Sequence, residues 1–260
     1  MYNVKVIQFP NGTSIIKIYD EIISPPTKKK EKYVKNPFDG TLVKDEGVIT
    51  DKEDRLKMSL NRTKRAISYY SRSVLWTHWA TFTFNAKKID RCDYELVSRK
   101  MRIFLSNMKQ KNPDMKYLCV GEKHRDGVSY HFHALLSDIP NAKMTYSGKK
   151  DKFGNRIYNL PFKWGFNSVK KISEHDSIHI AKYLSKYLSK EILTLKKHSQ
   201  RYFVSKGLPK PQIKTMCIPY WELEEEITKI ADSLGAVTDV REINGYYSYK
   251  EIEIDGGMVN

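Results

Sequence analysis

Two short groups of residues carry side chains that could act together on a phosphate. The first is Tyr130-His131-Phe132-His133, a His-x-His within an apolar stretch. The second is the tandem repeat Tyr183-Leu184-Ser185-Lys186-Tyr187-Leu188-Ser189-Lys190. Imidazoles two residues apart point to one side of a strand and can share a metal ion. Tyrosine hydroxyls are potential nucleophiles, so the two groups would suit attack on a phosphate beside a metal.

The residues before the His pair predict a carboxylate ligand. Asp126-Gly127 favours a two-residue type I′ turn, which would join two strands as a hairpin. In that register Glu122 lies directly opposite His131, and His133 projects from the same face. His124 lies on this side too and could substitute or assist. Without such a partner, a His-x-His could simply decorate a strand.

Two imidazoles and one carboxylate define the kind of metal expected. Such a set leaves coordination positions for water and a phosphate oxygen. It therefore suits Mn²⁺ or Mg²⁺ in phosphate chemistry, and it could also hold zinc or iron.

The tyrosine repeat falls on one side of a helix expected at 176–197. At about 100° per residue, Tyr183, Tyr187, Lys186 and Lys190 share a sector about 100° wide. An apolar stripe lies beside this sector and would face the core, formed by Ala181, Leu184, Leu188, Ile192 and Leu195. A phenol with a pKa of about 10 is a poor nucleophile unless a cation stabilises the phenolate. The alternative is that the tyrosines pack at the margin of the stripe and the lysines are solvated.

The charge distribution points to a polyanionic partner. The chain has 46 Lys and Arg against 30 Asp and Glu, a net charge of +16. Residues 222–255 hold ten acids and three bases, so the rest of the chain, with 43 bases and 20 acids, carries +23. A field of this sign favours nucleic acid. An anionic membrane is the rival partner, but no basic amphipathic helix with a large aromatic face stands out.

Cysteine usage and hydropathy give an expectation about location. Cys92, Cys119 and Cys217 are few and widely spaced, which implies neither a disulfide framework nor a zinc ribbon. The first residues lack the pattern of a signal peptide, and no apolar run approaches membrane-spanning length. We expect a cytoplasmic protein that does not associate with membranes.

The pattern along the chain predicts an α+β fold. The expected elements alternate between strands and helices: a hairpin at 1–24, a basic linker at 25–54, a helix at 52–73, a central strand at 79–84, a helix at 93–111, strands at 116–124 and 129–137, a loop or exposed hairpin at 141–162, a strand at 165–172, a helix at 176–197, an acidic helix at 218–234 and a hairpin around Asn244-Gly245. This order favours a central antiparallel sheet flanked by helices. We expect an N-terminal segment 1–75, a core domain 76–211 and an acidic C-terminal segment 212–260.

Taken in order, these motifs resemble the HUH superfamily of rolling-circle replication initiators. The closest likeness is to replication proteins of small phages and plasmids related to filamentous-phage gene II protein. Ala80-Thr81-Phe82-Thr83-Phe84 resembles the family's first strand motif, and His131-Phe132-His133 its His-hydrophobic-His motif. The Tyr183–Lys190 repeat resembles its helical Tyr-x-x-x-Tyr followed by Lys. Trp164-Gly165-Phe166 and Ser205–Pro211 are also similar, so the likeness covers roughly residues 76–211.

The resemblance implies a ferredoxin-like or RNA-recognition-motif-like domain with a defined activity. That activity is metal-dependent nicking of single-stranded DNA at a replication origin, with a 5′-phosphotyrosine intermediate, a free 3′-hydroxyl and later rejoining. Glu122, His131 and His133 would bind the metal, and Tyr183 and Tyr187 would be the nucleophiles, assisted by Lys186 and Lys190. We assign DNA contacts to Lys182, Arg201 and Lys206.

The expected partners and the competing functions follow from the same likeness. No Gly-x-x-x-x-Gly-Lys-Ser/Thr motif is present, so strand separation would fall to a host helicase, and a host polymerase would extend the 3′ end. Conjugative relaxases place the tyrosine before the His pair, which argues against that class. A single-strand transposase, a non-catalytic nucleic-acid-binding protein of the same fold and a metal hydrolase using water remain alternatives.

Overall fold

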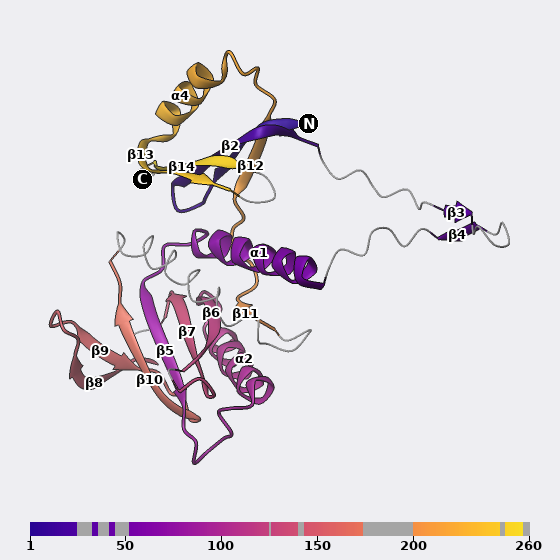
Figure 1. Cartoon of the computed structure of the whole chain (residues 1–260). Coiled ribbons are helices and arrows are strands. Elements are labelled where there is room, and N and C mark those ends of the chain that lie inside the picture. The colour runs from indigo at the N-terminus through magenta and orange to yellow at the C-terminus, as the bar shows by residue number, and fades with distance from the viewer. Residues whose placement is uncertain are drawn as a thin grey trace. The chain divides into compact units, whose positions relative to one another are not determined.

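The computed structural model describes two compact units, each with its own antiparallel sheet (Figure 1). The residues described are 1–24, 33–35, 42–44, 52–124, 126–139, 143–173, 200–244 and 248–256, with the backbone alone at 33–35, 42–44 and 52–58. One unit comprises residues 59–210, and the other comprises residues 1–58 and 211–260. The predicted α+β class, with a central antiparallel sheet and flanking helices, is confirmed.

The unit of residues 59–210 is built on a seven-stranded sheet. Its strand order is β11-β6-β7-β5-β10-β9-β8. The strands are β5 (His78–Phe84), β6 (Lys116–Lys123), β7 (Tyr130–Ser137), β8 (Thr145–Lys150), β9 (Arg156–Asn159), β10 (Gly165–Lys171) and β11 (Tyr202–Val204). β5 lies between β7 and β10, as its alternating β-branched and aromatic residues predict for a central strand.

Strand alternation gives this sheet two different faces. Ala80, Phe82 and Phe84 of β5 are buried on the face covered by α2 (Tyr94–Lys111), which we call the α2 face. Asp93 caps α2 by accepting hydrogen bonds from the backbone of Glu95 and Leu96. The intervening residues of β5 point to the other face, where each is half-buried. That other face is the one on which the predicted ligands lie.

Helix α1 (Lys52–Ser71) is joined to the β11 edge of the sheet by its second half. Arg201 donates hydrogen bonds from Nη1 to Ser59 Oγ at 3.1 Å and to Thr63 Oγ1 at 3.2 Å. The rings of Tyr70 and Tyr202 lie 6.0 Å apart. These contacts fasten the chain that re-enters the sheet as β11.

The second unit brings the two ends of the described chain into one sheet. Its strand order is β12-β1-β2-β14-β13, and its strands are β1 (Tyr2–Gln8), β2 (Thr13–Ile23), β12 (Gln212–Met216), β13 (Ala236–Ile243) and β14 (Tyr249–Asp255). Helix α4 (Leu223–Leu234) buries Ile227 and Ala231 against the apolar residues of β1, β2 and β14. Segments 1–75 and 212–260, distinguished in the sequence, thus both contribute strands to this sheet. The short strands β3 (Tyr33–Lys35) and β4 (Leu42–Lys44) pair with each other.

Most expected elements are confirmed, and two strands were missed. The hairpin at 1–24, the helices at 52–73 and 93–111, the strands at 79–84, 116–124, 129–137 and 165–172, the exposed hairpin at 141–162 and the hairpin around Asn244-Gly245 all form. The acidic helix begins at Leu223 rather than at 218, after a turn in which Glu222 N donates to Pro219 O. Strands β11 and β12 were not predicted. The helix expected at 176–197 and most of the linker at 25–54 lie outside the described residues.

The hydrophobic core of the seven-stranded sheet allows a test of stability. Phe82 is fully buried, and its ring contacts Phe104 and Phe162 edge-on at centroid distances of 5.5 Å and 5.2 Å. Phe82→Ala should lower the free energy of unfolding by about 3–5 kcal/mol, because it leaves a cavity among these rings. Hydrogen exchange of the β5 amides in the full chain would measure this. Phe166→Ala on the adjacent strand β10 is the matched control, and an equal loss there would contradict this account of the core.

Candidate metal centre

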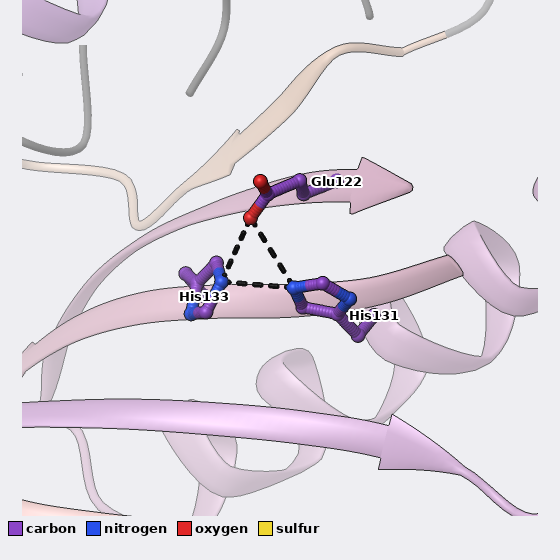
Figure 2. A group of neighbouring side chains, drawn as sticks. All are labelled: Glu122, His131 and His133. Atoms are coloured by element: carbon purple, nitrogen blue, oxygen red, sulfur yellow. Dashed lines mark hydrogen bonds and ion pairs between the residues drawn. The ribbon is translucent and has the colours of Figure 1, made fainter. Parts of the chain in front are cut away.

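A single hairpin holds the three predicted metal ligands. β6 and β7 pair with Glu122 opposite His131 and Lys123 opposite Tyr130, which is the register predicted from the turn. Glu122, His131 and His133 therefore share one face of the sheet, which we call the metal face. Figure 2 shows the carboxylate reaching from β6 toward both imidazoles on β7.

The turn that sets this register differs from the prediction. A type I′ turn needs positive φ at both central residues, but Gly127 has φ 73° and Asp126 is not among the residues with positive φ. Asp126 instead accepts hydrogen bonds from the backbone N–H groups of Val128 and Ser129 and from the Ser129 hydroxyl. The type I′ prediction is wrong, because the Asp126 side chain caps a longer loop between His124 and Ser129. The hydrogen bonds from Ser129 and Val128 hold the pKa of Asp126 well below its usual range.

The donor atoms of the triad converge on one point. Glu122 Oε2 lies 2.9 Å from His133 Nε2 and 3.2 Å from His131 Nε2, and the two Nε2 atoms are 3.0 Å apart. Two donors bound at about 2.1 Å to one ion and at right angles to each other would be about 3.0 Å apart. The three side chains thus fit a divalent ion, and they form a potential metal-binding group among the residues described.

The environment keeps the Glu122 carboxylate ionised. Burial raises the pKa of Glu122, but the hydrogen bonds and positive charge of His131 and His133 outweigh that effect and lower it to about 2. The three side chains are 13–15% exposed, so they are shielded but reachable from solvent. An anionic oxygen beside two imidazoles is the donor set expected for a cation that acts on phosphates.

Residues of β5 position the His133 ring. Trp79 stacks on it with a centroid distance of 5.0 Å, and Thr81 Oγ1 lies 3.1 Å from His133 Nδ1. When Nδ1–H donates to Thr81, the lone pair of Nε2 is free to point toward Glu122. By contrast, His131 Nδ1 is buried and has no hydrogen-bond partner among the residues the structure describes.

The Thr81 contact leads to a prediction on metal affinity. Thr81→Val removes the acceptor for His133 Nδ1 while keeping the shape of the side chain. We expect Mn²⁺ to bind about 10- to 100-fold more weakly, as measured by isothermal titration calorimetry. Thr83→Val, one turn of the pleat further along the same face, is the control and should bind Mn²⁺ as the wild type does. Equal affinities for the wild type and Thr81→Val would show that Thr81 does not orient the ligand.

The other predicted site residues fall into three groups. His124 is not part of the donor group. Its ring packs edge-on against His131 at 5.5 Å, and its Nδ1 faces Asp126 at 3.8 Å. Arg201 is half-buried against α1 as described above, and Lys206 is exposed in the loop after β11. Tyr183, Tyr187, Lys182, Lys186 and Lys190 lie outside the described residues.

Thr81 and Trp79 were quoted in the sequence as strand residues only, and no role toward the His pair was predicted for them. Their role depends on β5 pairing with β7, in which Thr81 faces His133. Strand alternation could have placed them on one face, but not beside the His pair, because the partner of β5 is not encoded locally.

Comparison with known proteins identifies the segment that contains this centre. Residues 77–192 match the family described as replication-associated protein ORF2/gene II protein. No curated protein and no solved structure matches the chain. None of the helices in the described ranges has the length and apolar character needed to cross a membrane. Over residues 77–192, which include all three donors of the triad, this chain belongs to the replication-associated protein ORF2/gene II protein family.

Proposed function

We propose that this replication-associated protein nicks and rejoins single-stranded DNA at a replication origin, using a divalent metal and a tyrosine nucleophile. The observation that carries the proposal is the convergence of Glu122 Oε2, His131 Nε2 and His133 Nε2 within 3.2 Å of one another in the family-matched segment. A Mn²⁺ or Mg²⁺ ion held there would neutralise charge on the scissile phosphate.

The chemistry of the step assigns the remaining roles by sequence. A tyrosine Oη forms a bond to phosphorus while the bond from phosphorus to the 3′ oxygen breaks, and a proton passes from the phenol side to the leaving oxygen. The products are a 5′-phosphotyrosine and a free 3′-hydroxyl, and attack by a 3′-hydroxyl on the phosphotyrosine reverses the step. Tyr183 and Tyr187 are the proposed nucleophiles, with Lys186 and Lys190 stabilising the phenolate.

The metal face offers a surface for the substrate strand. Phe166 on β10 pairs with Thr83, and Thr83 pairs with His131, so these side chains form one row across the sheet. Phe166 is 68% exposed, and two inter-strand spacings put it about 10 Å from His131. Aromatic side chains in such positions stack on the bases of single strands. We therefore propose that a nucleotide next to the cleaved phosphate stacks on Phe166.

The position of Phe166 is fixed by its neighbour Gly165. A Cβ at residue 165 would lie 2.1 Å from the carbonyl oxygen of Thr83. No larger residue fits there without moving β10 away from β5. The close approach of the two strands supports a rigid stacking position at the end of the sheet where the donors lie.

Binding to non-specific single strands should depend steeply on salt. Lys and Arg contacts to phosphates release counterions, so the logarithm of the affinity should fall linearly with the logarithm of salt concentration, with a slope of about −0.7 for each phosphate neutralised. Fluorescence anisotropy across a salt series would measure this slope. A flat response would mean that the positive charge outside residues 222–255 serves something other than DNA.

Cleavage of a pool of origin-region single strands with Mn²⁺, followed by mass spectrometry of the covalent product, tests the proposal. The expected result is a peptide with an attached 5′-phosphate and a 3′-hydroxyl on the released strand. Cleavage without an adduct would indicate a metal hydrolase using water, and binding without cleavage a non-catalytic protein. A host helicase and a host polymerase are the proposed partners, because the chain has no helicase motif and the product is a primer end.

A further inference from the structure

The hairpin formed by β8 and β9 is a basic arm at the edge of the seven-stranded sheet. In the order β7-β5-β10-β9-β8, its outer strand is four positions from the strand that carries the His pair (Figure 1). At about 4.8 Å for each step, β8 is about 20 Å from β7. We define residues 145–159 as the arm. Its exposed basic side chains are those of Lys149, Lys150, Lys152 and Arg156.

The only acid of the arm is committed to its turn. Asp151 Oδ1 accepts hydrogen bonds from the backbone N–H groups of Phe153 and Asn155, both at 2.9 Å. Asp151 N donates to Asn155 O, and Gly154, with φ 84°, donates to Asp151 O. The carboxylate therefore shapes the tip rather than pairing with an arm cation, and the four positive charges remain directed to solvent.

The same hydrogen bonds present an aromatic ring at the tip. Phe153 is 76% exposed, and Lys152 Nζ lies 4.7 Å from its centroid. An exposed phenylalanine loses little conformational freedom on binding when its backbone is already fixed. The other exposed ring of the arm, Tyr146, contacts Arg156 at 5.4 Å and Tyr158 at 6.2 Å. The arm thus offers one open ring at its tip and not a row of rings along one face.

The arm is not placed to hold the strand at the triad. Tyr146 pairs with Tyr158, and Tyr158 pairs with Val169, whose side chain is buried on the α2 face. The arm's aromatic residues therefore lie on the face opposite the metal face. At 3.4 Å for each base step, a distance of about 20 Å corresponds to about six base steps from the cleaved position.

We propose that this arm grips base-paired DNA flanking the cleaved position, with its four cations on phosphates and the Phe153 ring wedged against a base step. A two-stranded ribbon fits the major groove, and apolar wedges can open base steps. Single strands are typically bound by successive stacked rings, which the arm does not provide. The inference rests on the proposed function for its biological setting, but the contact itself needs no cleavage.

The test compares two fluorescent probes: a short bare single strand, and the same strand extended by a hairpin duplex. The wild type should bind the extended probe more tightly. Replacing the four arm cations by Gln should remove that advantage and make the salt slope on the extended probe shallower by about 3 to 4, at about 0.9 for each phosphate contact. Binding to the bare strand should not change. Arg99→Gln with Arg102→Gln on the exposed side of α2 is the charge control and should keep the advantage.

The Phe153 ring has a separate readout. With 2-aminopurine in the duplex, wild-type binding should raise the fluorescence through unstacking, Phe153→Ala should not, and Phe153→Trp should restore the rise. The affinity of Phe153→Ala for the extended probe should fall about tenfold. Melting of the full chain should not change, since the ring is exposed.

Two outcomes would overturn the arm proposal. One is an equal loss by the arm variants on both probes, which would mean that the arm binds single strands. The other is no loss on either probe. Failure of the wild type to cleave would count against the proposed function and leave these binding results intact.

Discussion

His131→Ala together with His133→Ala is expected to abolish cleavage of origin-region single strands, with a fall of about 10³-fold or more in rate. The reason is that both nitrogen donors of the triad are lost, and stabilisation of phosphate charge by a metal is worth several kcal/mol. Binding of single strands should be largely retained, because phosphate contacts come mainly from Lys and Arg. Single-turnover cleavage with Mn²⁺ and anisotropy on the same probe would measure the two effects.

The hairpin itself supplies the matched controls for this experiment. His124→Ala removes an imidazole that packs against His131 but does not belong to the donor group, so cleavage should persist. Glu122→Ala should weaken Mn²⁺ binding in calorimetry, because it removes the anionic donor. If the double His variant cleaves at the wild-type rate, the assignment of the metal centre is wrong.

Tyr187→Phe is expected to eliminate the initial covalent adduct with DNA. Phenylalanine keeps the ring and removes only the hydroxyl, so the change separates chemistry from folding. We expect Tyr187 to attack first because Lys186 and Lys190 flank it, while Tyr183 would take the second transfer. Tyr183→Phe should therefore still nick but fail to join strands. Adduct formation on denaturing gels and strand transfer between two labelled oligonucleotides would follow the two steps.

The outcomes of the tyrosine series discriminate sharply between assignments. The opposite pattern would exchange the two roles, since Tyr183 lies one turn nearer the expected start of the helix, where the dipole favours negative charge. An adduct that survives in the double Phe variant would rule out tyrosine catalysis at this helix. Peptide mapping of that adduct would then identify another nucleophile.

The metal centre could be predicted from sequence because it is local. Glu122 and His133 are only 11 residues apart, and a turn at Asp126-Gly127 is enough to fix which residues face each other. The register was right although the turn type was wrong, because several loops between His124 and Ser129 give the same pairing. The helix cap at Asp93 and the alternation of 79–84 were readable for the same reason, since each depends on neighbouring residues.

The features that could not be predicted depend on distant partners. β11 and β12 are short edge strands whose pairing with β6 and β1 is set by tertiary contacts, not by their own residues. Thr81 becomes a partner of His133 only because β5 and β7 are neighbours, 52 residues apart in sequence. The rigid tip at Phe153 needed the Asp151 hydrogen bonds, which a Gly-rich polar segment does not reveal.

The position of β14 in its sheet has a consequence for biosynthesis. β14 lies between β2 and β13, yet it follows β2 in the sequence by more than 220 residues. At a translation rate of about 5–20 residues per second, the nascent β1–β2 hairpin waits roughly 10–45 s for that neighbour. During this interval one edge of β2 has open backbone groups that attract other strands. The family-matched segment 77–192 emerges from the ribosome earlier, so any message cut short before β14 yields a chain with its metal-binding hairpin complete and a terminal sheet prone to aggregation.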